Sequence, residues 1–250
     1  MNRNHASTLL VLVSFLVLLS GALAAENTIA VNTALEINGR YIWRGMDIAS
    51  TPSLQPTLSL SFGGFELGTW GAYTLSNEAS ESDEIDFWGA YTFGFENGAS
   101  VTALATDYYF PNAGIDFFNF NNHDAVIDDT IPDPGAHTIE IGASFTGPES
   151  FPITISGFVN VYNDAGSNTY FQVDLPVKVN GTELTLFCGA AGGSEDNPDY
   201  YGTDKLSIIN VGVSTVREIA VSESFSLPLS VSFIINPKAE ISYLVAGFSF

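Results

Sequence analysis

The sequence has little cysteine, few basic residues and few long apolar runs. Its single cysteine, Cys188, cannot form an internal disulfide, and its apolar surroundings predict a small strand side chain. Seven lysines and arginines stand against 28 acids, a formal charge of −21, which argues against nucleic acid as a partner because phosphates are repelled. No segment beyond residue 24 approaches 18 uninterrupted apolar residues, so no membrane-spanning helix is expected.

The N-terminal segment has the organisation of a secretory signal peptide. Arg3 precedes an apolar run from Leu9 to Leu19, and the small residues of 20–24 end in an A-x-A cleavage motif. We therefore expect residues 1–24 to be removed on export and residues 25–250 to form the mature domain.

The most regular pattern in the mature chain is a strict alternation of apolar and polar residues. A period of two gives a strand with one apolar and one polar face. Here the polar face carries small hydroxyls rather than charges, which is typical of a barrel with lipid outside and water inside. In residues 53–62 the apolar set is Leu54, Pro56, Leu58, Leu60 and Phe62.

Continued along the chain, the same pattern predicts twelve strands and an all-β fold. Most of them reach the ~9–11 residues that a tilted strand needs to cross the hydrocarbon layer. The predicted strands are 29–44, 53–62, 65–75, 84–95, 99–110, 136–146, 151–162, 169–179, 182–192, 204–216, 225–235 and 239–250.

The connections alternate between short turns and longer acidic loops, as in outer-membrane barrels, where the turns are periplasmic and the loops extracellular. Asn180-Gly181 is a strong two-residue hairpin signal. With an even strand count, the expected architecture is one closed antiparallel transmembrane β-barrel. A soluble sandwich or barrel would also alternate, but only 14% of the residues are charged, which is low for a soluble surface. Aromatic residues also gather at strand ends, where interfacial girdles lie.

Several sequence blocks resemble the TorF-type porins, a poorly characterised family of bacterial outer-membrane β-barrel proteins. The resemblance covers roughly residues 39–175 and implies location and architecture rather than an activity. The C-terminal strand, which ends in Phe250, also looks like the signal read by the barrel-assembly machinery of Gram-negative bacteria. The blocks that carry the family resemblance are 41–45 (YIWRG), 52–55, 64–71, 84–91, 108–111 and 140–144.

The inward parity of the predicted strands carries a mixture of charged and small polar residues. The charged set holds five acids and three bases, which predicts a slightly negative lumen and a preference for cations. Loop 111–135 is rich in aromatic residues and asparagine, and the sequence leaves open whether the lumen is open or plugged by this loop. The predicted pore-lining residues are Glu36, Arg40, Arg44, Glu66, Asp86, Glu140, Asp174 and Lys178.

Arg44 is the single residue for which the sequence makes the most specific prediction, because a charge at barrel height must be paired or hydrated. In a closed barrel the first and last strands pair, which predicts an ion pair between Arg44 and Glu240 at the seam, or between Arg44 and Asp86. This pair would either gate the pore or simply bridge the seam.

The acidic loops raise the question of metal binding, since clusters of carboxylates bind Ca²⁺ or Mg²⁺. No loop has the spacing of a known calcium motif, and Asp128, Asp129 and Asp133 are the weak candidates. More often such residues are solvated, or share divalent cations with lipopolysaccharide phosphates. No cofactor is expected.

Three functions remain open from the sequence. The first is a narrow, passive or weakly cation-selective channel for small solutes. The second is a non-conducting barrel whose acidic loops engage a surface partner or, through divalent cations, lipopolysaccharide. The third, a hydrolase, is disfavoured because neither histidine of the mature chain, His123 or His137, accompanies a nucleophile motif. We therefore expect a protein that is not an enzyme.

Overall fold

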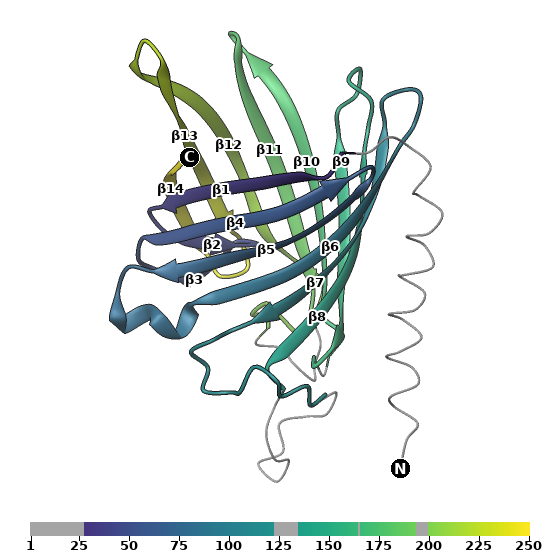
Figure 1. Cartoon of the computed structure of the whole chain (residues 1–250), viewed down its shortest axis with the longest axis vertical. Helices are drawn as coiled ribbons and strands as arrows, with labels where there is room; N and C mark the ends of the chain where they lie inside the picture. The colour runs from purple at the N-terminus through teal and green to yellow at the C-terminus, as the bar shows by residue number, and fades with distance from the viewer. Residues whose placement is uncertain (1–27, 123–134, 165, 194–199) are drawn as a thin grey trace.

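In the computed structural model, which describes residues 28–122, 135–164, 166–193 and 200–250, twelve antiparallel strands close into one barrel (Figure 1). This confirms the predicted fold class. Neighbours in the ring follow chain order except that β4 is next to β1, and β1 closes the ring against β14. The wall strands are β1 (Ala30–Asn38), β4 (Ser53–Phe62), β5 (Phe65–Thr74), β6 (Glu84–Gly94), β7 (Ser100–Tyr109), β8 (His137–Thr146), β9 (Thr154–Tyr162), β10 (Thr169–Val179), β11 (Thr182–Gly192), β12 (Ser207–Ser222), β13 (Phe225–Asn236) and β14 (Ile241–Ser249).

The two faces of the wall differ as the alternation predicts. On β4, Ser53 and Ser59 are 0% and 3% exposed, whereas Leu58 between them is 49% exposed. The middle of β8 repeats the contrast, with Glu140 2% exposed and Ile141 47% exposed. One sheet closed on itself, with no second sheet over its apolar face among the described residues, excludes the sandwich alternative.

Short turns and longer loops occupy opposite ends of the barrel, which we call the turn end and the loop end. At the turn end, Asn180 and Gly181 have φ values of 51° and 83° and join β10 to β11, the geometry of a tight hairpin that needs positive φ at both positions. The β12–β13 hairpin is longer than predicted, because β12 stays paired with β13 as far as Ser222. The short 3-10 helix η1 (Asn77–Ser82) lies at the loop end, and no helix among the described residues is long and apolar enough to cross a membrane.

The first predicted strand, 29–44, is wrong in its second half. β1 ends at Asn38, and the chain bends at Gly39 and Arg40 to form a separate two-stranded sheet, β2 (Tyr41–Trp43) with β3 (Met46–Ala49). This hairpin lies within the ring of strands rather than extending the wall (Figure 1). A strand of sixteen residues is longer than a bilayer requires, so its outer part is free to take another path.

The departure of β1 from the wall shortens the seam that closes the barrel. β1 pairs with β4 along all nine of its residues but with β14 only along Glu36–Asn38. Backbone hydrogen bonds of Leu35 with Phe250 and of Gly39 with Ala246 extend this contact by one residue at each end. The seam is therefore the shortest joint between neighbouring strands of the twelve-strand wall.

The exposed apolar face predicts a test of what surrounds the barrel. Ile141 lies midway along β8, so arginine there should cost about 2–4 kcal/mol of unfolding free energy if the face meets lipid. Leu206, 70% exposed in the loop before β12, is the control, and arginine there should cost at most about 1 kcal/mol. Urea unfolding of the folded protein in lipid vesicles measures both changes, and equal, negligible costs would contradict a lipid-facing wall.

Candidate functional site

The β2–β3 hairpin lies in the lumen, and the turn at its tip is encoded by its sequence. Its two central residues, Arg44 and Gly45, have φ values of 50° and 80°, as the turn types that match strand twist require. A side chain at Gly45 would overlap the carbonyl oxygen of Ile209 on β12, so glycine serves both the turn and the close approach. The Gly45 carbonyl also accepts a hydrogen bond of 3.1 Å from the Asn236 side chain of β13.

A buried ion pair fixes the tip of the hairpin to the far wall. Arg44 Nη1 lies 2.5 Å from Glu140 Oε2 on β8, and Nη2 lies 2.8 Å from Oε1, so the contact is bidentate. The two side chains are only 10% and 2% exposed. The Tyr108 hydroxyl donates to Glu140 Oε1 at 2.9 Å, and Arg44 Nη1 donates to the Tyr201 hydroxyl. The charges are thus matched and their remaining hydrogen-bonding capacity is largely used.

Aromatic rings enclose the guanidinium group. Its central carbon lies 4.5 Å from the ring centroid of Trp43, 4.6 Å from that of Phe158 and 4.5 Å from that of Tyr170. These distances are within the range of cation–π attraction, which is stronger where water is excluded. Trp43 in turn stacks on Tyr201 at 5.7 Å and 15°. The hairpin tip is therefore held by charge, hydrogen bonds and ring contacts together.

Tyr200 and Tyr201, in the loop before β12, complete the packing around the tip. Tyr201 is 2% exposed, and burial raises the pKa of its phenol, while Arg44 acts in the opposite direction. Burial likewise raises the pKa of Tyr200. Both phenols therefore remain neutral near pH 7, and the Tyr201 hydroxyl can accept the arginine hydrogen bond.

The base of the hairpin is held by weaker contacts. The Tyr41 hydroxyl donates to Glu84 Oε2 on β6 at 2.8 Å, and the Tyr41 ring lies 5.4 Å from that of Trp70. Arg40 lies 3.1 Å from Asp47, within the hairpin, with both side chains partly exposed. An exposed pair of this kind contributes about 0–1 kcal/mol, far less than the buried pair at the tip.

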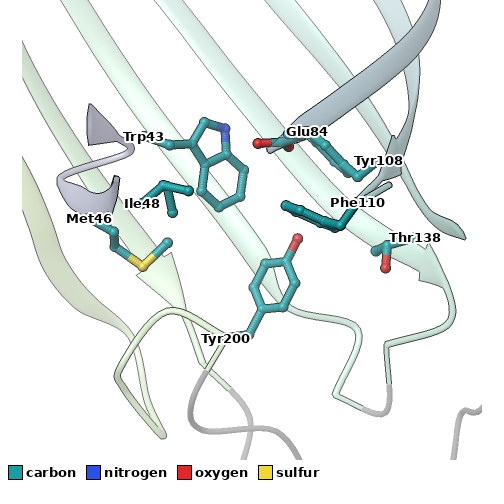
Figure 2. Close-up of a pocket in the computed structure, with 8 residues that line it drawn as sticks. All are labelled: Trp43, Met46, Ile48, Glu84, Tyr108, Phe110, Thr138 and Tyr200. Carbon is teal, nitrogen blue, oxygen red and sulfur yellow. The ribbon is translucent and has the colours of Figure 1, made fainter. Parts of the chain in front are cut away.

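The hairpin separates two cavities. One, of about 170 Å³, lies at the loop end and is mostly aromatic (Figure 2). The other, of about 230 Å³, lies between the hairpin and β10–β13 and is lined by polar side chains including Arg44, Gln172, Asp174 and Asn210. An aromatic chamber thus lies on one side of the hairpin and a polar chamber on the other.

Among the described residues, the only predicted pore-lining residues that form an ion pair with each other are Arg44 and Glu140. Arg44 pairs with Glu140 in place of Glu240 or Asp86, because the chain leaves the wall and carries Arg44 across the lumen. Glu240 lies instead in the turn between β13 and β14, where its φ is 57°.

The other predicted pore-lining residues have different partners. Asp86 interacts with Glu84 and lies near Glu140, Arg40 pairs with Asp47, and Asp174 shares the polar cavity with Arg44. Glu66 accepts a hydrogen bond from Ser59, and Asp174 accepts one from Gln172. Glu36 lies beside the seam, and Lys178 faces Glu183 across the β10–β11 ladder.

Loop 111–135 does not fold inward where the structure describes it. His137 at the start of β8 is 1% exposed, with Nδ1 2.9 Å from Asp107 Oδ2 and Nε2 2.6 Å from the Phe117 carbonyl oxygen. Asp107 on β7 and His137 on β8 both lie on the outward face of the wall. The Phe120 ring stacks on the His137 imidazole, with 4.4 Å between the ring centroids. The loop packs outside because its phenylalanines are more stable on the apolar outer face than in a polar lumen.

This placement also bears on the hydrolase hypothesis. Both ring nitrogens of His137 face acceptors, a carboxylate and a backbone carbonyl, which leaves neither free to take a proton from a nucleophile. His123 and the weak metal candidates Asp128, Asp129 and Asp133 lie outside the described residues. Within the described ranges, no group of three metal-ligating side chains comes together.

Sequence reasoning missed the aromatic residues that surround the hairpin and the role of Glu84. One signal was present: Arg44-Gly45 is flanked by apolar residues and lies within a strand too long for a bilayer crossing. Tyr200 and Tyr201 carry no local signal, because only the closed barrel brings them to the hairpin.

No protein-family model matches the chain, and no curated protein matches it. Among solved structures, an outer-membrane channel from Pseudomonas putida F1 is similar, with 12% identity over 91% of this chain and 95% of that chain and a TM-score of 0.46. Channel function is a property of that protein, and membership of the TorF-type porins stays a prediction from the sequence.

Replacing Gly45 with alanine should release the hairpin tip. Gly98→Ala is the matched control, because Gly98 also has positive φ, 84°, but a side chain there meets nothing within 4 Å. Both variants carry a backbone cost of about 1–2 kcal/mol, and only Gly45→Ala adds the overlap with Ile209. Hydrogen exchange of the amides of residues 41–49 should rise in Gly45→Ala alone, and equal protection in both variants would contradict tight docking at Gly45.

Proposed function

We propose that this protein is a porin-like channel of the bacterial outer membrane that passes small solutes through a bore narrowed by the β2–β3 hairpin. One observation carries the proposal. The hairpin pairs only with itself and is joined to the far wall by side-chain contacts and single hydrogen bonds, not by a strand ladder. It can therefore shift in the lumen without breaking the twelve-strand wall.

Location in the outer membrane is supported by the two faces of the wall. Large apolar side chains are exposed around the outside, whereas polar residues line the inside, as water-filled barrels require. Twelve strands lie between the eight that side chains alone fill and the sixteen or more that leave a wide aqueous channel. A lumen of this size is narrow, so one hairpin occupies much of it.

The charge of the lumen supports a weak preference for cations. The sequence already predicts more acids than bases on the inner face, and the structure adds Asp47 on the hairpin and Glu84 on β6. Arg44 is neutralised by Glu140, so its charge does not favour anions. Carboxylates at a constriction attract cations and repel anions.

Planar-bilayer recording of the refolded protein tests the channel. Glu140→Gln should leave Arg44 buried without a charge partner, at a cost of about 3–5 kcal/mol. This cost corresponds to at least a ~10²-fold shift toward the undocked hairpin. Larger or more frequent single-channel openings are expected.

Arg40→Gln, which breaks the exposed Arg40–Asp47 pair, is the comparison and should have a far smaller effect. Replacing residues 39–52 with Asn-Gly should give the largest conductance, because it removes the hairpin and joins β1 directly to β4. If this deletion conducts no better than the full chain, the hairpin does not narrow the bore.

Reversal potentials under a KCl gradient test the charge argument separately. A modest preference for K⁺ over Cl⁻ is expected from the acidic lumen. A preference for Cl⁻ would contradict it.

The aromatic packing at the loop end favours one alternative, a barrel that binds rather than conducts. Trp43 stacks on Tyr201 at the loop end, and Tyr200 meets both rings edge to face. A barrel that shows no conductance in planar bilayers, and conducts only after the hairpin is deleted, would support this second function.

The remaining partners are part of the same proposal. They are outer-membrane lipid, lipopolysaccharide beside the acidic loops, and the barrel-assembly machinery. Phe250, 60% exposed, is available for such recognition, although its backbone N–H and carbonyl both bond to Leu35.

A further inference from the structure

The aromatic cavity at the loop end has a lining that a passive bore does not need. It lies between the hairpin, the ends of β6–β8 and the loop before β12, and measures about 170 Å³. Typical sites for drug-sized ligands are ≈ 300–1,000 Å³, so this cavity admits only a molecule of a few heavy atoms. Its walls include Trp43, Met46, Glu84, Tyr108, Phe110 and Tyr200.

Four of the lining residues are aromatic and come from three separate parts of the chain. Trp43 meets Tyr108 edge to face at 5.9 Å and meets Tyr200 in the same way at 6.2 Å. Figure 2 shows the Trp43, Tyr108, Phe110 and Tyr200 rings around one space, with the Tyr200 hydroxyl directed toward its middle. Aromatic faces carry negative electrostatic potential and attract cations.

One charged side chain lines this space. The Glu84 carboxylate, 4% exposed, is directed toward the Trp43 ring and accepts the Tyr41 hydroxyl (Figure 2). Asp86 follows two residues later on the same face, and its carboxyl group interacts directly with that of Glu84. The nearby guanidinium of Arg44 is already committed to Glu140. Because two carboxyl groups in contact share a proton, the pair carries about one negative charge, and no basic side chain among the described residues is left to match it.

We propose that this cavity binds a small organic cation of the quaternary ammonium or alkylammonium class. Such a ligand fits the aromatic walls and supplies the missing positive charge beside Glu84. A hard metal ion fits poorly, because Mg²⁺ or Ca²⁺ needs six or more oxygen ligands and these walls are mainly carbon. A neutral apolar solute fits less well, since it would leave Glu84 desolvated without a cation.

Titration of the full, detergent-solubilised barrel with choline tests the proposal. The matched probe is 3,3-dimethylbutan-1-ol, which has the same shape without the charge. Isothermal calorimetry should give at least about tenfold weaker binding of the alcohol. Glu84→Gln keeps the side-chain size and should weaken choline binding by about tenfold. Choline and the alcohol should then bind this variant with similar affinity.

Two further variants complete the test. Tyr200 lies in a loop outside the wall, so Tyr200→Leu should not prevent folding. This variant should also weaken choline binding. Glu218→Gln removes a carboxylate near the turn end, where it bonds Ser226, and should leave choline binding as in the wild type.

Equal affinity for choline and the alcohol, or no binding of choline by the wild type, would overturn the proposal. A loss of binding in Glu218→Gln equal to that in Glu84→Gln would also overturn it, because net charge alone would then explain the effect. The measurement needs no membrane, so a barrel that binds choline without conducting would refute the channel and leave this site standing.

Discussion

The arrangement inside this barrel depends on one buried ion pair, Arg44 with Glu140. Two charges removed from water are costly, and their attraction offsets that cost only when both are hydrogen-bonded as well. Tyr108 and Tyr201 supply those bonds, and three aromatic rings exclude water. Net stabilisation from such a pair is small, but each charge has a single acceptable partner. The pair therefore acts mainly on specificity, since it helps to determine the position of a hairpin that has no strand ladder with the wall.

Most of the wall was predictable because its signals are local. Alternation with period two identifies a strand and its apolar face from the strand alone, as Leu58 and Ile141 show. The turn at Asn180-Gly181 likewise needs only its own two residues. Strand ends were less certain, and β12 continues well beyond its predicted end because its ladder with β13 stabilises residues whose own pattern is weak.

The contents of the lumen could not be read in the same way. Alternation continues past Asn38, so nothing in the local period marks the point where the chain leaves the wall. The partner of Arg44 depends on which strand lies opposite, a property of the closed ring. The position of the aromatic loop was left open for a related reason: its contact with the wall runs through His137, whose pairing with Asp107 forms only when β7 and β8 pair.

The short seam has a mechanical consequence. A closed barrel held by cross-strand hydrogen bonds opens first along its shortest ladder. Here that ladder is the seam, which on β1 runs only from Leu35 to Gly39. Thermal fraying should therefore begin between the first and last strands, before the rest of the wall yields. The bend at Gly39 that delivers the inner hairpin also shortens this joint, so the placement of the hairpin and the weakness of the closure have a common origin.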